Sequence, residues 1–203
     1  MSKRTKGIFC LEGDWSNDLK RPFSVRPVLE MLDQWETNGA RHIYHDVATA
    51  DELWYYLKKW RQKRFESHPI LFLAFHGIRD GIRVGDGRTE ITIDDIENVL
   101  EGQCAGRIVH FGSCEVMDIH GHRIRRFLRR TRALAVSGYR NVVDWNQSAA
   151  FELLMLAAMQ EGAQTVAGIK KIRKTIARNA HGLEKALNFR ILPRDPVARR
   201  AKA

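Results

Sequence analysis

Cysteines and long apolar runs are both scarce in this sequence. It contains three cysteines, Cys10, Cys104 and Cys114, in 203 residues. Such a sparse, odd set is typical of a reduced cytosolic protein and not of a disulfide framework. No apolar run approaches the roughly 18 residues that a membrane span needs. The stretch from Gly7 to Leu11 is too short for the hydrophobic region of a signal peptide. We therefore expect a cytoplasmic protein without a membrane segment.

Internal repeats and linkers are also absent, so we expect residues 1–203 to form a single domain. This length allows a full hydrophobic core, and 44% apolar with 29% charged residues is ordinary for a globular protein. Residues 193–203, PRDPVARRAKA, are predicted to be a flexible basic tail. No separate regulatory domain fits within this length. An enzyme of this size would therefore need control from a regulatory protein partner, a sensor or proteolytic processing.

Positive charge is in excess, and the 34 Lys and Arg residues against 24 Asp and Glu give a net charge of +10. Much of it lies in residues 122–132, residues 170–178 and the tail. In the first two segments the apolar residues recur at helical spacing, so the cations occupy the outer faces of amphipathic helices. Such runs are usually solvated helix faces. They also fit a surface for nucleic acid or an acidic partner, although no aromatic-interleaved basic strand or zinc-finger spacing accompanies them.

Apolar strands alternate with helical segments along the chain. The strands are expected at 6–13, 41–47, 70–75, 107–112 and 133–139, with a hairpin around 85–87. The helices are expected at 24–39, from the capping box at 49–52 onward, at 92–100, and in the segments 122–132, 147–162 and 165–182. The third strand is apolar at every position, as a strand covered by helices on both faces requires. This order predicts a three-layer α/β sandwich with a mostly parallel central sheet.

A histidine and a cysteine each follow one of these buried strands. His76 comes after the strand at 70–75, and Cys114 comes after the strand at 107–112. The carboxyl ends of parallel strands meet at one edge of a sheet, where ligands bind, so neighbouring strands would make the two side chains face each other. An imidazole beside a thiol is the arrangement of a cysteine nucleophile with its acid/base. Taken singly, each residue would more often be a loop histidine or a small buried cysteine.

The segments LFLAFHG, IVHFGSCEVMD and ALAVSGYRNVVDWNQSAAFELLML, over positions 70–155, resemble the caspase-like cysteine peptidases of the caspase–gingipain–separase superfamily. Within that superfamily they are most similar to the bacterial CHAT-type peptidases. The resemblance implies a caspase-like fold and an endopeptidase acting on protein or peptide substrates without a cofactor. It implies that Cys114 is the nucleophile, that His76 is the general acid/base, and that the amides of Gly77 and Cys114 form the oxyanion hole. Bacterial relatives often serve in defence against phage or in regulated cell death.

The sequence departs from eukaryotic caspases around the cysteine, where Gly-Ser-Cys-Glu-Val stands in place of Gln-Ala-Cys-x-Gly, so aspartate specificity is not expected. By resemblance, the segment after the fifth strand contributes to the substrate pocket, with Tyr139, Asp144 and Trp145 as binding residues. A buried carboxylate beside an aromatic wall would select a basic P1 side chain. Two alternatives stay open for Asp144: neutralisation by Arg140, or capping of the helix that follows.

The remaining candidates favour structural roles. His120 and His122, with Asp118 and Cys114, imitate a zinc cluster, but structural zinc sites show tighter pairs at recurring spacing, so no metal site is expected. His110 is predicted to lie in the core or behind the site. Two functions compete: an endopeptidase, and a catalytically silent module whose basic helices bind nucleic acid or an acidic protein. The pair at the strand ends favours the first.

Overall fold

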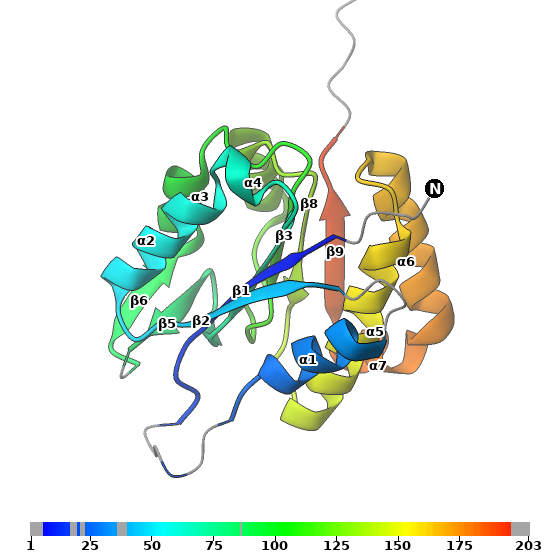
Figure 1. Ribbon diagram of the computed structural model, residues 1–203, viewed down its shortest axis with the longest axis horizontal. Helices are drawn as coiled ribbons and strands as arrows, with labels where there is room; N and C mark the ends of the chain where they lie inside the picture. Colours follow the sequence, from blue (N-terminus) through cyan, green and yellow to red (C-terminus); the bar gives the residue numbers. More distant parts are fainter. Residues whose placement is uncertain (1–5, 17–19, 21–22, 36–39, 86, 196–203) are drawn as a thin grey trace, which may run out of the picture.

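The computed structural model describes residues 6–16, 20, 23–35, 40–85 and 87–195. A six-stranded sheet with the order β2-β1-β3-β7-β8-β9 lies at its centre (Figure 1). The first five of these strands are parallel, and β9 pairs antiparallel with β8. The strands are β1 (Ile8–Glu12), β2 (His42–Asp46), β3 (Ile70–Ala74), β7 (Ile108–Phe111), β8 (Ala135–Tyr139) and β9 (Phe189–Pro193).

Helices cover both faces of this sheet. Figure 1 shows α1, α5, α6 and α7 on one side and α2, α3 and α4 on the other. Their bounds are α1 (Arg26–Trp35), α2 (Ala50–Trp60), α3 (Ile93–Leu100), α4 (Gly121–Thr131), α5 (Trp145–Glu161), α6 (Val166–Asn179) and α7 (His181–Ala186). A 3-10 turn, η1 (Lys63–Phe65), follows α2. The protein is therefore a three-layer α/β sandwich, which confirms the fold class predicted from the sequence.

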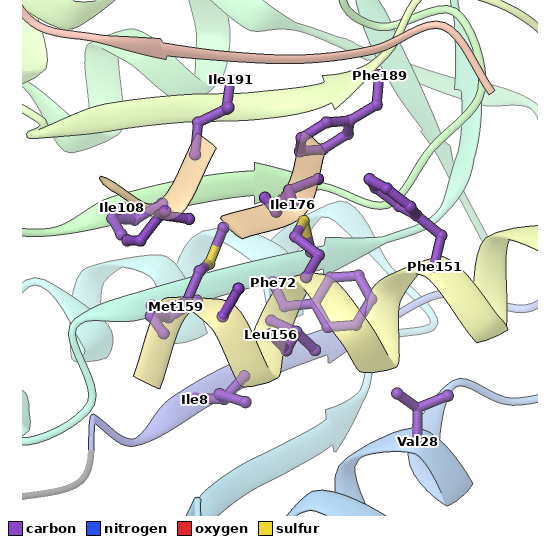
Figure 2. Packing of buried hydrophobic residues seen from close by; sticks show 14 of the residues in the cluster. Ile8, Val28, Phe72, Ile108, Phe151, Leu156, Met159, Ile176, Phe189 and Ile191 are labelled. Atoms are coloured by element: carbon purple, nitrogen blue, oxygen red, sulfur yellow. The ribbon is translucent and has the colours of Figure 1, made fainter. Parts of the chain in front are cut away.

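The strands are buried on both faces because their alternate side chains enter two separate cores. In β3, Ile70 and Phe72 join the core beneath α5, whereas Leu71 and Leu73 join the core beneath α2, α3 and α4. Figure 2 shows the first core, with Leu156 of α5 beside Phe72. The continuous apolar run in the sequence follows directly from this two-sided packing.

The helix starts read from the sequence are confirmed for α2 and α3. Thr49 forms a capping box with Glu52, and Thr92 forms another with Asp95. In each case the threonine hydroxyl accepts a hydrogen bond from a free backbone N–H of the first turn. The carboxylate in turn accepts a hydrogen bond from the backbone N–H of the threonine. Both threonines are therefore the N-cap residues that the sequence predicted.

Three elements differ from the sequence prediction. A second, three-stranded antiparallel sheet consists of β4 (His76–Ile78), β5 (Gly81–Val84) and β6 (Thr89–Thr92), so the predicted hairpin carries an additional strand. The helix α7 and the strand β9 were not predicted. Pro193, predicted to begin the tail, instead ends β9 opposite Ala135. Proline is tolerated there because β9 is an edge strand. Residues 196–203 of the predicted tail lie outside the described residues.

No helix in the described part of the chain is long and apolar enough to cross a membrane.

Candidate active site

The carboxyl ends of β1, β3 and β7 lie side by side, because these strands are consecutive in the sheet. From β1 the chain goes to β2 on one side and then to β3 on the other, so the strand order reverses between β1 and β3. In open α/β sheets this reversal leaves a crevice beyond the strand ends. Leu73 of β3 is in register with Phe111 of β7. The strands that precede His76 and Cys114 are therefore neighbours, as the sequence argument required.

His76 stands two residues beyond the end of β3 and is the first residue of β4. Its side chain is exposed, and its Nε2 lies 2.9 Å from the carbonyl oxygen of Trp15. A carbonyl oxygen can only accept a hydrogen bond, so Nε2 carries the hydrogen and donates it. In the neutral ring, Nδ1 then keeps the lone pair that can take up a proton.

A row of aromatic rings begins at His76, beyond the carboxyl ends of the strands. The Trp15 indole meets the His76 ring edge-on at a centroid distance of 5.3 Å and the Trp145 ring at 5.1 Å. Phe23 packs on the far side of Trp145 at 5.5 Å. Such edge-to-face pairs contribute about 0.5–1.5 kcal/mol each beyond the burial of their area. The row fixes the plane of the imidazole and gives the site an apolar wall.

Glu12, the last residue of β1, holds the segment that carries Trp15. Its carboxylate is buried. Oε1 accepts the Trp15 indole N–H and the backbone N–H of Val25, the latter at 2.8 Å. Oε2 accepts the hydroxyls of Ser24 and Tyr44, both at 2.6 Å. Burial raises the pKa of Tyr44 well above the ordinary value, which keeps its hydroxyl protonated. The Tyr44 hydroxyl also lies 2.6 Å from Asp46 Oδ1, so its single hydrogen is shared between the two carboxylates. The bonds from Trp15, Ser24 and Val25 hold the chain after β1 in place.

Cys114 lies three residues beyond β7, in a segment fastened to β3. The buried Ser113 hydroxyl accepts the backbone N–H of Phe75 at 3.2 Å and donates to the carbonyl oxygen of Leu73 at 3.4 Å. The Cys114 side chain is half-buried, and its Sγ accepts the backbone N–H of Val143 at 3.4 Å.

The backbones of Gly77 and Cys114 are in direct contact. A Cβ added to Gly77 would lie 1.8 Å from the carbonyl oxygen of Cys114 and 2.5 Å from its nitrogen. No side chain fits at position 77, and glycine is what permits this approach. His76, Gly77 and Cys114 are therefore brought together, with the histidine and the thiol on adjoining backbone segments.

The backbone bends sharply directly after Cys114. Glu115 follows it with a φ of +57°, a left-handed conformation that disfavours a non-glycine residue by about 1–2 kcal/mol. The backbone N–H of Glu115 bonds the carbonyl oxygen of Asn141 at 3.2 Å. The N–H of Cys114 itself has no acceptor within the described residues. An N–H of this kind is what an oxyanion hole uses. The Gly77 amide, the other expected donor, lies in β4 opposite Ile82.

Asp118 ties together three loops around Cys114. Its carboxylate accepts Arg79 Nη2 at 2.6 Å, from the turn after β4, and Arg140 Nη2 at 3.3 Å, from the segment after β8. The hydrogen bond from Arg79 is the main cause that lowers the pKa of Asp118, and Arg140 adds to it. Arg140 therefore pairs with Asp118 and does not neutralise Asp144.

The three expected substrate-binding residues have different positions. The exposed Asp144 is the N-cap of α5, and its Oδ1 accepts the backbone N–H of Gln147 at 2.9 Å. The capping alternative is therefore the one that the structure contains. Tyr139 is completely buried, which corrects its expected place on a pocket wall. Trp145 alone lies beside the site, as a half-buried member of the aromatic row.

A buried ionisable group lies behind the segment that carries Cys114. Glu152 of α5 accepts the Tyr139 hydroxyl at 3.2 Å, and its Oε1 is 3.7 Å from His110 Nε2. A Cβ on Gly112 would be 3.0 Å from the same carboxylate oxygen. Burial raises the pKa of Glu152, and His110 opposes this rise. His110 is fully buried, as predicted for a core histidine, with Nδ1 3.1 Å from the Ser137 hydroxyl. Its Nε2 has no hydrogen-bond partner within the described residues, so the histidine is not fully satisfied, contrary to our expectation.

Neither the other cysteines nor a metal cluster competes with this site. Cys10 and Cys104 are buried, and burial raises the pKa of the Cys104 thiol to about 12. The residues that the structure describes contain no group of three or more side chains placed to hold a metal ion. His120 and His122 are exposed and stack on each other at 5.6 Å.

Sequence reasoning missed four contributors to the site: Glu12, Trp15, Ser113 and Val143. Glu12 did give a signal, because it is the one charged residue in the otherwise apolar strand IFCLE. Such a residue needs buried partners and hence a special role. Trp15 contacts His76 through a backbone carbonyl, and Val143 contacts Cys114 through a backbone amide. Backbone groups are the same for every residue type, so the sequence does not reveal such contacts in advance.

Comparison with protein families gives a match to a family of unknown function, DUF6642, whose model covers residues 5–192. The search of curated proteins finds no match.

Proposed function

The chain belongs to the DUF6642 family of unknown function, and we propose from its site that it is a caspase-like cysteine endopeptidase. Cys114 would be the nucleophile and His76 the general acid/base for hydrolysis of peptide bonds in protein substrates. The contact between the backbones of Gly77 and Cys114 carries the proposal. It sets the histidine and the thiol on adjoining segments at the ends of neighbouring strands.

In the first step the Cys114 sulfur attacks the scissile carbonyl carbon, and the thiol proton passes to His76 Nδ1. A C–S bond forms, the carbonyl π pair moves onto oxygen, and the Cys114 N–H, with that of Gly77, donates to the oxyanion. As the intermediate collapses, the C–N bond breaks and His76 delivers a proton to the leaving amine. A thioester to Cys114 remains. His76 then takes a proton from the attacking water. The C–S bond breaks, His76 returns that proton to the sulfur, and the acid product leaves with the thiol and the neutral imidazole restored.

The proton path follows from how the imidazole is held. Nε2 is occupied by the Trp15 carbonyl oxygen at 2.9 Å, so Nδ1 is the nitrogen that exchanges protons with substrate. Glu12 and the aromatic row act on this step indirectly, because they fix Trp15. Holding the acid/base in place before substrate arrives is a large part of what a catalytic site contributes.

The setting of the activity rests on the resemblance to bacterial CHAT-type peptidases. We place the protein in the cytoplasm, acting on protein or peptide substrates without a cofactor and under the control of a regulatory protein partner. A role in bacterial defence or regulated cell death fits that class. A catalytically silent binding module would have no use for a half-buried thiol beside a positioned imidazole.

Covalent labelling tests the proposal directly. A peptidyl acyloxymethyl ketone should modify Cys114, and neither Cys10 nor Cys104, because those two thiols are buried and burial raises the pKa of both. Cys114→Ala should lower the hydrolysis of a peptide library by at least about 10³-fold with an unchanged melting temperature. Cys104→Ala is the matched control and should keep the activity. Undiminished turnover by Cys114→Ala, in a preparation free of other proteases, would overturn the assignment.

A further inference from the structure

The outer face of α6 carries five exposed cations along a single helix. They are Lys170, Lys171, Arg173, Lys174 and Arg178. The helix contains no acidic residue, and its apolar side chains Ile169, Ile172 and Ile176 are at most 2% exposed. No ion pair involves these cations within the described residues, and Arg178 bonds the neutral amide oxygen of Asn179. The positive charge of α6 is therefore turned to solvent.

The other basic helix, α4, differs from α6 in this respect. Its Arg123, Arg126 and Arg130 all pair with carboxylates of α3, including Glu97, which is 1% exposed. Arg130 Nη1 lies 2.7 Å from Glu97 Oε1. The arginines on this side of α4 therefore serve the contact between α3 and α4. Of the two basic segments seen in the sequence, α6 keeps the larger uncompensated charge.

Carboxylates on the elements that pack against α6 do not neutralise it. Those elements are α5, α7 and β9, and β9 contains no acidic residue. Glu152 of α5 is buried against His110. Glu161 at the end of α5 and Glu184 of α7 form no ion pair with α6 within the described residues. The local field at this face is therefore positive.

We propose that α6 binds the phosphate backbone of nucleic acid. A lipid surface is disfavoured, because membrane-bound amphipathic helices insert their apolar face, and the isoleucines of α6 are packed inside the protein. An acidic protein partner would need an apolar centre of large side chains to its interface, and the other exposed positions of α6 are only Ala167, Ala177 and Asn179.

The spacing of the cations along α6 suits contact with the phosphate backbone of a nucleic acid. Lys170, Lys174 and Arg178 follow one another at four-residue intervals, about 6 Å per step along the helix. They form a line of charge that can follow successive phosphates of one strand. The helix exposes no aromatic side chain for stacking on bases. The binding is therefore electrostatic and independent of base sequence.

Fluorescence anisotropy with a labelled 24-base-pair DNA duplex of mixed sequence tests this. The logarithm of the association constant should fall with the logarithm of salt concentration, with a slope near about −0.9 for each phosphate neutralised. Lys170→Gln/Lys174→Gln should reduce that slope by about two units. Arg125→Gln/Arg129→Gln, on exposed residues of α4 across the sheet, removes the same charge and should leave the slope unchanged. Matching melting temperatures would verify that each variant folds.

Each outcome bears on the proposal. Equal losses in the two double variants would mean that net charge alone attracts the duplex, and would overturn it. Binding to poly-glutamate or to vesicles containing anionic lipid, without binding to a duplex, would overturn it as well. The same measurement with an RNA duplex of the same sequence is needed because DNA and RNA offer the same phosphates. The duplex that binds more tightly identifies which nucleic acid α6 prefers. Labelling of Cys114 is independent of all these results.

Discussion

Gly77 and Cys114 meet backbone to backbone at the ends of β3 and β7. A Cβ on Gly77 would come within 1.8 Å of the Cys114 carbonyl oxygen, and backbone atoms cannot move aside as a flexible side chain could. The close approach of the segments that carry His76 and Cys114 therefore depends on the absence of a side chain at position 77.

Gly77→Ala is expected to force the two segments apart and to lower kcat/KM by at least about 10²-fold, because a displacement of about 1 Å in a catalytic group has that effect. Gly182→Ala is the matched control. Gly182 lies in α7 with nothing within 4 Å of an added Cβ, so its replacement should leave activity unchanged. Peptide hydrolysis and thermal unfolding of both variants measure this, and an active Gly77→Ala enzyme would contradict the assigned contact.

His76→Ala should abolish hydrolysis but leave Cys114 open to alkylation. In the proposed mechanism the imidazole protonates the leaving amine, whereas the sulfur has its own contact with the Val143 amide, which the substitution leaves in place. The rates of iodoacetamide labelling and of amide hydrolysis, measured on the same preparation, separate the two roles. His122→Ala, at an exposed histidine of α4, is the control. Wild-type kcat/KM in His76→Ala would require another acid/base.

Asp144→Ala is expected to reduce the free energy of unfolding by about 1 kcal/mol, because α5 loses the side chain that accepts the Gln147 amide. Asp144→Ser should restore most of this stability, since serine also caps helices. Urea unfolding measures both variants. The choice of P1 residue in a peptide library should not change in either variant. A lost preference for basic P1 residues in Asp144→Ser would instead assign the carboxylate to the substrate pocket.

Glu152→Gln should flatten the dependence of stability on pH. Because burial raises the pKa of Glu152, the folded state binds a proton at pH values where the unfolded state has released it. The favourable contribution is complete below the unfolded pKa of about 4.3 and is lost as the pH rises through the folded pKa. Glutamine cannot titrate, so this decline should be absent from the variant.

Urea unfolding at a series of pH values from about 4 to 8 measures the decline in each protein. The matched control is Glu161→Gln, at an exposed carboxylate of the same helix. It should follow the wild-type curve. An identical decline in Glu152→Gln would mean that other groups cause the pH dependence and would contradict the prediction.

The sequence predicted the fold best where a strand is buried on both faces, because every position of such a strand has to be apolar. The continuous apolar run of β3 predicted helices on both faces, and the same run showed that His76 lies just past a buried strand. Tyr139 was wrongly predicted to line the substrate pocket, although the alternation of side chains along β8 indicates a core position. It is in phase with Ala135 on β8, and both belong to the core beneath α5. The strand β9 and the helix α7 were missed because each is short and only partly buried.

The position of β9 in the chain has a consequence for protein synthesis. It is the last of the described strands, yet it pairs with β8, which is the neighbour of the strand that leads to Cys114. Until residues 189–193 have been translated, β8 is an unpaired edge that can bind other chains. The parallel pairs of β1, β3 and β7 also join distant segments, which slows their formation. A ribosome-bound chain therefore carries both candidate catalytic residues, His76 and Cys114, before it can complete the sheet around them.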